Sequence, residues 1–302
     1  MGRRRHGLDI HGIVLLDKPA GISSNRALQR VRGIFQARKA GHTGSLDPFA
    51  TGMLPICLGE ASKTAAFMLE SCKRYRATAL LGEATTTGDV EGDIIQTCPL
   101  PAIEPANLSQ SLQQFVGEIE QVPPMYSALK HEGKPLYEYA RAGIEVERRA
   151  RPVTIRHLVM LDWQSPLLTF DVHCSKGTYI RTLAEDIARS LDTCAHLVGL
   201  RRTAVEPFDD FPMQTLEQLQ DARESGDLNK FLLPVDAGLA AWPRIELNTS
   251  QKDKFKHGNP VQLAFEGSGP GKVRVYGQEN DLLGLAVFCG DGMLKPAKVF
   301  NL

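Results

Sequence analysis

The segment Gly41-His42-Thr43-Gly44-Ser45-Leu46-Asp47-Pro48-Phe49-Ala50-Thr51-Gly52 is the most informative part of this sequence. Its three glycines and one proline predict a loop whose backbone adopts dihedral angles that other residues avoid. An aspartate on such a loop can lie exposed at the floor of a cleft, because loops often carry functional residues. An aspartate in a turn more often bonds its own backbone. The segment alone therefore leaves two interpretations of Asp47 open.

A phosphate-binding loop is another interpretation of a glycine-rich segment. Such loops end in Gly-Lys-Ser or Gly-Lys-Thr, and no such ending follows here. The carboxylate of Asp47 would also repel a phosphate group. The sequence therefore argues against a nucleotide-binding loop.

Patterns on either side of the loop predict a mixture of strands and helices. Short apolar runs predict strands at 13–16, 77–81, 153–161 and 168–174, and helices are predicted at 26–36, 62–70, 108–116 and 182–191. The cluster Ser23-Ser24-Asn25 is a candidate N-cap for the first helix. Because these elements follow no strict strand–helix–strand rhythm, the sequence favours a mixed α+β sheet over a doubly wound one.

The last part of the chain has a different composition. From Trp242 onward the sequence consists of short apolar runs separated by glycine-rich turns at 267–271 and 290–292. This pattern is typical of a small β-rich module. We expect a main domain at residues 1–240 and a second domain at residues 241–302.

Composition limits the class of protein. The 302 residues are 42% hydrophobic and 23% charged, which is ordinary for a globular protein. No apolar run approaches the roughly 18 residues that a membrane-spanning helix needs. The six cysteines are scattered without a CxxC pair, so neither a disulfide framework nor a zinc site is expected. These features favour a reducing cytoplasm.

Charge is balanced overall but unevenly distributed. Lysine and arginine total 35, as do aspartate and glutamate. Residues 1–40 contain nine basic and two acidic side chains, residues 82–121 contain seven acidic side chains and no basic one, and residues 122–160 contain seven basic and four acidic ones. One charged run is usually a solvated face. Two basic blocks favour a basic face suited to a polyanion.

Several segments resemble motifs of the TruB family of pseudouridine synthases. Residues 42–52 resemble the catalytic motif of that family, and other matches follow in family order over residues 10 to about 205. They are Leu16-Asp17-Lys18-Pro19-Ala20-Gly21-Ile22-Ser23-Ser24-Asn25, Leu54-Pro55, Leu58-Gly59-Glu60-Ala61, Lys73-Arg74-Tyr75-Arg76, Pro124-Met125-Tyr126-Ser127-Ala128-Leu129-Lys130, Ser175-Lys176-Gly177-Thr178-Tyr179-Ile180-Arg181, His196-Leu197 and Leu200-Arg201-Arg202.

The resemblance implies a fold and a reaction. The expected fold is a mixed, largely antiparallel central sheet flanked by helices, with a small β-rich PUA-like domain at the C-terminus. The expected reaction converts uridine 55 in the TΨC loop of tRNA to pseudouridine without a cofactor or metal. The N-glycosidic bond breaks, the uracil turns and C5 joins the sugar, so no atom is gained or lost. A carboxylate could attack covalently or remove a proton, and the sequence leaves both open.

Three residues match the catalytic positions of the family. Asp47 matches the essential aspartate, and Arg181 matches the residue expected to pair with it. Burial raises the pKa of an aspartate above its ordinary value of about 3.9, so a fixed cation is needed beside it. Arginine suits this role because it stays charged and offers forked donors. Tyr75 matches the aromatic residue that stacks on the target uracil.

Four further residues are expected near the substrate. Tyr179 and Leu200 match positions that line the uracil pocket. Lys18 belongs to a Lys-Pro motif that buttresses the catalytic loop and is expected to contribute to substrate binding. Because the target lies inside the folded tRNA arm, the enzyme must flip it, at a cost of a few kcal/mol. His42 matches a histidine beside the flipped bases and is expected to stack in the vacated space.

Basic residues are expected to contact RNA phosphates, which position an RNA without reading its sequence. They are Arg148, Arg149, Arg151, Arg201, Arg202 and the run Arg3-Arg4-Arg5. The C-terminal module weakly resembles the PUA-like domain that grips the acceptor side of tRNA. The resemblance implies tRNA as the partner, with no membrane and no obligate protein partner. The chain is expected to be monomeric.

Three alternatives remain at this point. Guide-RNA-dependent relatives of the dyskerin type share the catalytic motif, but partner-binding extensions and lysine-rich tails are expected of them. A tRNA-folding chaperone could retain the fold without activity, although an intact set of Asp47, Tyr75 and Arg181 argues against that loss. A hydrolase built on the same loop lacks support, because no Ser-His-Asp or metal arrangement is visible.

Overall fold

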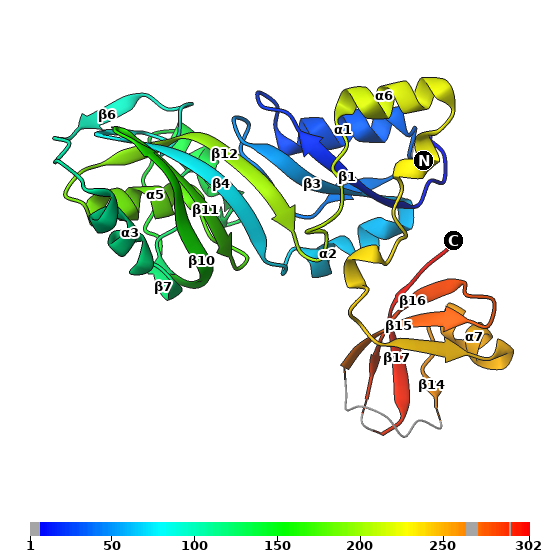
Figure 1. The fold of residues 1–302 in the computed structure, drawn as a ribbon. Coiled ribbons are helices and arrows are strands. Elements are labelled where there is room, and N and C mark those ends of the chain that lie inside the picture. Colours follow the sequence, from blue (N-terminus) through cyan, green and yellow to red (C-terminus); the bar gives the residue numbers. More distant parts are fainter. Residues whose placement is uncertain (1–6, 264–270, 290) are drawn as a thin grey trace.

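The computed structural model describes residues 7–263, 271–289 and 291–302. Figure 1 shows an elongated molecule with a large curved sheet and a smaller sheet beside one of its ends. The predicted Arg3-Arg4-Arg5 contact and most of the turn at 267–271 lie outside the described residues.

The larger sheet has eight strands. They are β1 (Gly12–Lys18), β2 (Ala40–His42), β3 (Thr51–Leu58), β4 (Lys73–Leu81), β7 (Gly117–Gln121), β10 (Arg151–Gln164), β11 (Leu167–Cys174) and β12 (Ala195–Val205). Their order is β1-β3-β12-β4-β11-β10-β7, with β2 also paired to β3. All pairings are antiparallel except a short parallel contact between β3 and β12. The predicted mixed α+β architecture is confirmed.

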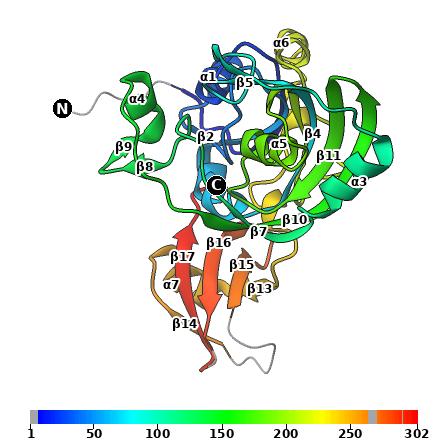
Figure 2. The ribbon, with the colours of Figure 1, turned by 90° about the vertical axis from the view of Figure 1, so that its left-hand side faces the viewer.

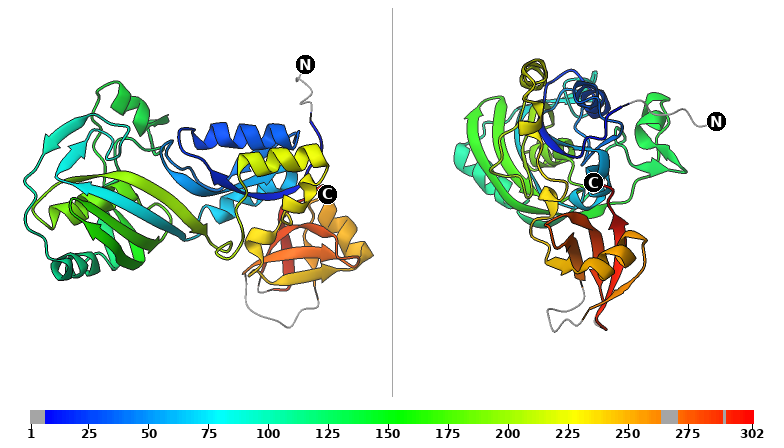
Figure 3. Two further views of the ribbon diagram at one scale, coloured as in Figure 1. Left: turned by 45° about the horizontal axis from the view of Figure 1, so that its top comes forward. Right: turned by 90° about the vertical axis from the view of Figure 1, so that its right-hand side faces the viewer.

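Alternation along β1 explains why this strand is buried on both faces. Val14 and Leu16 belong to a core with helices α1 (Ser24–Ile34) and α6 (Leu216–Ser225). Ile13 and Leu15 point to the other face and join a core that includes residues near the second sheet. Helices therefore cover one face of this end of the sheet, as Figure 3 shows.

The other end of the large sheet curves around helix α5 (Ile180–Arg189). Leu183, Ala184 and Ile187 of this helix are buried against strands β4, β11 and β12 in a common core. Helix α3 (Pro105–Gln113) adds Leu108 and Leu112 to it. The periodic apolar residues that predicted both helices thus form their buried faces.

The predicted helix at 62–70 is wrong in detail. The chain forms a short 3-10 segment, η1 (Gly59–Lys63), followed by a brief helix α2 (Ala65–Met68). The hydroxyls of Ser62 and Thr64 donate to the carbonyls of Gly59 and Ala61 at 2.8 Å each. Such side-chain bonds compete with regular helical ones and break up the helix. By contrast, the predicted N-cap is confirmed, because Ser23 accepts from the backbone N–H of Arg26.

Two small hairpins extend from the large sheet. β5 (Glu83–Thr85) pairs with β6 (Ile94–Thr97), and β8 (Lys130–His131) pairs with β9 (Lys134–Pro135) ahead of helix α4 (Leu136–Arg141). Figure 2 shows β8, β9 and α4 projecting to one side of the sheet.

The smaller sheet has five strands and one helix. They are β13 (Arg244–Leu247), β14 (Val261–Gln262), β15 (Gly271–Gly277), β16 (Leu282–Phe288), β17 (Met293–Val299) and α7 (Thr249–Lys256). The strand order is β13-β15-β16-β17-β14, around a separate apolar core. Lys63 donates to the carbonyl of Val299 at 2.7 Å, and Phe67 packs edge-on against Trp242. These contacts attach the smaller sheet beside α2.

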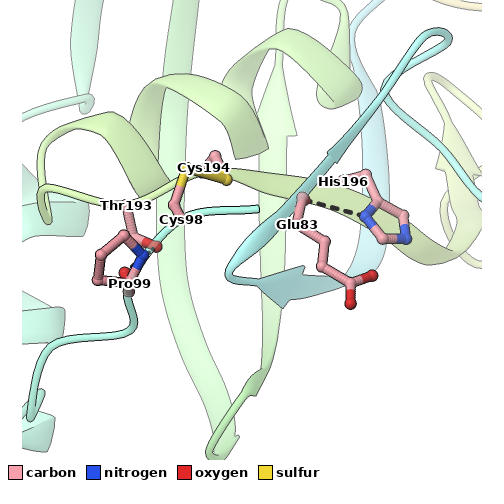
Figure 4. The surroundings of a disulfide bond; sticks show 6 residues. All are labelled: Glu83, Cys98, Pro99, Thr193, Cys194 and His196. Atoms are coloured by element: carbon pink, nitrogen blue, oxygen red, sulfur yellow. Dashed lines mark hydrogen bonds between the residues drawn. A yellow bond between two sulfur atoms is a disulfide. The ribbon is translucent and has the colours of Figure 1, made fainter. Parts of the chain in front are cut away.

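A disulfide corrects one expectation from the sequence. Cys98 and Cys194 are bonded, with their Cα atoms 5.8 Å apart at a sequence separation of 96. Cys98 follows the returning strand of the β5–β6 hairpin, and Cys194 directly precedes β12, as Figure 4 shows. Tertiary folding brings the two thiols together, and their sequence spacing gives no sign of it. Among the described residues, no helix is long and apolar enough to cross a membrane.

Candidate active site

The loop that carries Asp47 connects β2 to β3 where two strands approach unusually closely. Gly52 lies opposite Arg202 of β12 in the short parallel contact and has a φ of +98°. A Cβ atom at position 52 would lie 2.2 Å from the carbonyl oxygen of Arg202. Glycine is therefore required, and the close approach fixes the end of the loop against β12.

Lys18 anchors the loop through hydrogen bonds from its buried side chain. Its ammonium donates to the carbonyls of Pro19 and Ile22 at 2.8 Å each and to that of Pro48 at 3.2 Å. Burial lowers the pKa of Lys18 to about 8, and the nearby charge of Asp47 opposes this shift. The side chain has no exposed surface for a substrate, which corrects the expectation of direct binding. The buttressing part of that expectation agrees with the geometry.

A buried serine fixes the residue before Asp47. The Ser24 hydroxyl accepts from the backbone N–H of Leu46 at 2.7 Å and lies 2.9 Å from the carbonyl of the same residue. Helix α1 therefore positions the loop through its first residue. Ser24 belongs to the Lys-Pro motif that is expected to buttress the loop, and this pair of bonds gives it a specific role there.

Arg181 brings the candidate catalytic groups together. Its Nε atom lies 3.1 Å from Asp47 Oδ2, and its Nη1 atom lies 3.5 Å from Asp89 Oδ2. The same guanidinium donates to the carbonyls of Thr87 at 2.6 Å and Tyr126 at 2.7 Å. Arg181 is 5% exposed, whereas the Asp47 side chain is 37% exposed. The arginine is therefore fixed inside the protein, and one carboxylate remains accessible.

The charges around Asp47 partly cancel. Burial raises the pKa of Asp47, Arg181 and Lys18 lower it, and the like charge of Asp89 raises it. The net effect is a pKa above the ordinary value for aspartate. An ionised carboxylate with a raised pKa is a better base than one in water, and its fixed cation keeps it charged.

Asp89 is the main residue that sequence analysis missed. It is 2% exposed and lies in the turn of the β5–β6 hairpin. Its carboxylate accepts from the Thr87 hydroxyl at 2.6 Å and from the Glu91 backbone N–H at 3.0 Å. The only sequence signal was an Asp in a Thr-Thr-Thr-Gly-Asp turn. Asp89 also lies in the acidic run at 82–121, but charge counts alone assign it no role.

Aromatic and apolar groups lie beside the carboxylate. Tyr75 and Phe49 pack against the core that contains Leu46 and Leu200, and Leu200 is 9% exposed. Burial raises the pKa of the Tyr75 phenol, and Asp47 is close enough to add to this shift. The structure therefore places Tyr75 near Asp47, and Leu200 belongs to the core against which Tyr75 packs.

Tyr179 stands at the start of α5, two residues before Arg181. The Gln121 side chain accepts from its backbone N–H at 2.7 Å and donates to its carbonyl at 3.1 Å. Burial raises the pKa of Tyr179, with Asp47 again among the groups that contribute. The interaction with Asp47 places Tyr179 at the same site. Because Tyr179 is half-buried, part of its side chain remains accessible.

His42 lies at the other end of the loop, in β2. Its Nδ1 atom accepts from the Gly44 backbone N–H at 3.4 Å. Burial, together with the positive charge of Arg202, lowers the pKa of His42. A neutral imidazole is therefore favoured at this position.

Arg201 and Arg202 lie in very different surroundings. Arg202 is 1% exposed and donates to the carbonyls of Met53 at 2.6 Å, Gly44 at 3.2 Å and Ser45 at 3.4 Å. It has almost no surface for a phosphate, which corrects that expectation. Arg201 is bidentate to Asp17, at 2.9 and 2.7 Å, and its side chain is 41% exposed.

The remaining predicted RNA contacts lie before and at the start of β10. Arg149 and Arg151 are exposed. Arg148 is half-buried and donates to the carbonyls of Val146 at 3.1 Å and Pro123 at 3.3 Å. Arg149 and Arg151 are therefore accessible to an anionic partner in this region.

One group of potential metal ligands does not include Asp47. Within the described part of the chain, Cys72, His173 and Glu206 place their ligand atoms within 4.8 Å of one another. Sequence spacing gave no sign of such a group, because the three residues come from distant segments. At the Asp47 site the fixed cations of Arg181 and Lys18 lie near the carboxylates of Asp47 and Asp89, an arrangement that suits charge stabilisation more than metal binding.

Comparisons with known proteins agree with this geometry. The TruB family pseudouridylate synthase (N terminal domain) matches residues 32–180, the tRNA pseudouridylate synthase B C-terminal domain matches residues 181–240, and the pseudouridine synthase II TruB C-terminal region matches residues 243–300. The chain belongs to the TruB family. The family expectation is confirmed, and the chain is a pseudouridine synthase.

Full-length relatives support membership of the TruB family. A protein from Actinobacillus succinogenes named tRNA pseudouridine synthase B is 49% identical over 306 residues, which cover 100% of this chain and 98% of the relative. One of the same name from Haemophilus influenzae (strain PittEE) is 48% identical over 301 residues, covering 99% and 98%.

Solved structures confirm the fold. A chain of a Cbf5-Nop10-Gar1 complex aligns with a TM-score of 0.73 and 26% identity, over 96% of this chain and 85% of that one. A chain of an H/ACA RNP bound to a substrate RNA containing 2'-deoxyuridine aligns with a TM-score of 0.74 and 23% identity, over 100% and 92%. The second similarity supports the shared TruB-type fold alone.

Proposed function

We propose that this chain converts uridine 55 in the TΨC loop of tRNA to pseudouridine, with Asp47 as its catalytic carboxylate. The supporting observation is the ion pair between the accessible carboxylate of Asp47 and the buried guanidinium of Arg181. The names of the full-length relatives support tRNA as the substrate.

Asp47 is proposed to act on the glycosidic bond of the target uridine. In the reaction the N1–C1′ bond breaks, the C5–C1′ bond forms, and a proton passes from C5 to N1, so the substrate and product have the same composition. Arg181 orients the carboxylate and keeps it ionised in a partly buried site. Covalent attack and proton removal by Asp47 both remain consistent with this geometry.

The substrate base is proposed to enter the site by flipping out of the tRNA arm. Tyr75 offers an aromatic face for the uracil, and Tyr179 and Leu200 provide further walls. His42, held neutral at the edge of the loop, is proposed to stack in the space that the base leaves. Unstacking costs a few kcal/mol, which contacts with these side chains offset.

Basic surface residues are proposed to hold the RNA backbone. Arg149 and Arg151 are exposed, and the neighbouring Arg148 is partly exposed. Arg201 is also partly exposed and lies next to the end of the active-site loop. Replacing Arg148 and Arg149 together is expected to weaken tRNA binding and to flatten its dependence on salt concentration, because fewer counterions are released. An unchanged salt dependence would remove these residues from the RNA contact.

We propose that residues 1–240 form the catalytic domain and residues 241–302 a PUA-like domain that contacts tRNA. The separate apolar core of the five-stranded sheet supports this division. The chain is proposed to act as a monomer in the cytoplasm, where tRNA is modified. The Cys98–Cys194 disulfide is the feature that runs against a reducing compartment.

A guide-RNA-dependent enzyme is the main alternative function. The similar chain of the Cbf5-Nop10-Gar1 complex belongs to an assembly with other proteins and is 26% identical to this chain, whereas relatives named tRNA pseudouridine synthase B reach 49%. We therefore propose that tRNA alone is sufficient as substrate. A folding chaperone without catalysis is less well supported, because Asp47 and Arg181 form an intact pair.

The experiment that tests this function uses unmodified tRNA carrying tritium at C5 of its uridines. Incubation with the purified protein and no other component is expected to release tritium to water. A matched transcript with cytidine at position 55 is expected to release none. Release that continues from the cytidine transcript would contradict the assigned position, and no release from either transcript would contradict the activity.

A further inference from the structure

Three potential metal ligands meet at one end of strand β4. Cys72 directly precedes this strand, His173 lies in β11 and Glu206 directly follows β12. β4 pairs with both other strands, and His173 and Ala204 both lie opposite Arg74 in the register. Because side chains alternate along a strand, Cys72, His173 and Glu206 all project from the same face of the sheet.

The backbone holds the three donors in place. The Glu206 backbone N–H donates to the Cys72 carbonyl at 3.1 Å, so the pairing of β4 and β12 extends to these two residues. The imidazole Nε2 of His173 lies 3.1 Å from Glu206 Oε1. In a tetrahedral zinc site, with both atoms about 2.0–2.2 Å from the metal, this separation is about 3.3–3.6 Å. The His173 nitrogen and the Glu206 oxygen would therefore move apart by only a few tenths of an ångström to bind a zinc ion.

Exposure allows a metal ion to enter. Cys72 is 8% exposed, and the side chains of His173 and Glu206 are 16% and 38% exposed. Cys72 is therefore the most deeply buried of the three residues, and Glu206 is the most exposed to solvent. Ligand atoms within 4.8 Å of one another can close on one ion through small side-chain rotations, with water in the fourth position.

We propose that Cys72, His173 and Glu206 form a zinc site that clips β4, β11 and β12 together. A thiolate, an imidazole and a carboxylate are the three donor types that Zn²⁺ accepts. The thiolate and the carboxylate together balance the two charges of the ion, which lowers the cost of placing it in a partly buried position. Zinc binding releases the thiol proton to solvent and changes no oxidation state.

A reactive cysteine is the competing interpretation of the same three residues. A cysteine nucleophile needs a thiol that ionises easily, usually beside a cation or a helix N-terminus. Within this cluster the Cys72 sulfur faces the imidazole of His173 and the carboxylate of Glu206, whose ligand atoms lie within 4.8 Å of it. A carboxylate beside the sulfur opposes a free thiolate but suits a metal bound between the two groups.

The location gives the site a structural role. Tyr75 follows Cys72 by three residues on β4, and the Arg74 side chain between them pairs with Asp209 just beyond Glu206. Zinc would fix the beginning of the strand that presents Tyr75 to the active site. The expected consequence is a higher melting temperature with metal bound, by linkage between binding and folding.

Metal titration of the full-length protein tests the proposal. Chelator-stripped protein is expected to bind one equivalent of Zn²⁺ by calorimetry and to show thiolate-to-metal charge-transfer absorption when Co²⁺ is added instead. Cys72→Ser is expected to abolish the charge-transfer absorption and to weaken zinc binding by at least tenfold. Cys289→Ser removes a partly exposed free cysteine from the smaller sheet and serves as the matched control, with binding unchanged.

Two outcomes would overturn the zinc site. One is the absence of zinc binding by the stripped wild-type protein, and the other is cobalt absorption that persists in Cys72→Ser. If Cys72→Ser fails to fold by circular dichroism, His173→Gln and Glu206→Gln decide the question. Both are expected to weaken zinc binding at least tenfold, and wild-type affinity in both would refute the site.

Discussion

The surroundings of Asp47 and the smaller five-stranded sheet differ in how many charged side chains they bury. Lys18, Asp89, Arg181 and Arg202 lie around Asp47 with exposures between 0% and 5%. Within the described part of residues 241–302 no charged residue is fully buried. Arg274 of β15 pairs at 2.8 Å with the buried Asp236, which precedes the smaller sheet, and the ion pair between Lys252 and Asp281 lies near the surface. Burying a charge costs several kcal/mol unless partners compensate it. The first region therefore retains an electrostatic arrangement that stability alone would not select.

The largest effect is expected from Arg181→Met. This change leaves the buried carboxylate of Asp89 without its cation and frees Asp47, so the free energy of unfolding should fall by about 3–5 kcal/mol. Turnover should fall by about 10²-fold or more, because a fixed charge beside the reacting group is lost. Urea unfolding and single-turnover assays measure the two effects.

Arg189→Met is the matched control on the same helix. Its side chain is 73% exposed and pairs with Asp186 within the helix. The expected change in unfolding free energy is within about 0.5 kcal/mol. Equal losses in both variants would mean that the buried position of Arg181 has no special importance.

A smaller effect on stability is expected from Arg202→Met. The carbonyls of Gly44, Ser45 and Met53 would lose their donor, which should cost about 1–3 kcal/mol in unfolding free energy. The active-site loop would also shift, so turnover should fall more than tRNA affinity. Arg201→Met changes the adjacent residue in a partly exposed ion pair and should cost about 0–1 kcal/mol. Equal free energies of unfolding for the two variants would contradict the difference expected between the buried Arg202 and the partly exposed Arg201.

Asp89→Asn tests how the buried charges set the pH dependence. Burial raises the pKa of Asp47, and the negative charge of Asp89 adds to this shift. Activity requires ionised Asp47, so it is lost as pH falls through this pKa. Removing the charge of Asp89 should move the acidic limb of the single-turnover rate profile to lower pH. A limb that stays in place or moves upward would exclude this coupling.

The smallest effect is expected from Lys252→Ala in the smaller sheet. The ammonium lies 2.6 Å from Asp281, but both side chains are partly exposed, at 29% and 38%. Such pairs contribute little, because water and salt screen them. The melting temperature and the tritium-release rate should match those of the wild-type protein. A large loss would show that charge is as important in this sheet as around Asp47.

Local patterns predicted much of the fold and the centre of the site. The glycines and proline around Asp47 indicated its loop, and apolar periodicity indicated α5, which carries Arg181. Strands β3 and β12 were missed as elements, because Pro55 and Gly199 interrupt their apolar runs. Their parallel contact nevertheless fixes the end of the Asp47 loop.

Contacts between distant segments could not be read from spacing. Asp89, the Cys98–Cys194 disulfide and the group around Cys72 all depend on the way in which hairpins and strands fold together. The expectation that Arg202 contacts RNA phosphates could have been rejected from the sequence. Adjacent residues in a strand face opposite sides, so Arg201 and Arg202 could not both lie at the same surface.

The accessible carboxylate of Asp47 is tested most directly by Asp47→Asn. The variant keeps the shape of the side chain but has no charge for Arg181 to hold. With tRNA tritiated at uridine C5, single-turnover release should fall below detection, while tRNA affinity in a filter-binding assay stays within a few-fold of wild type. Tritium release at the wild-type rate would contradict the central role of this carboxylate.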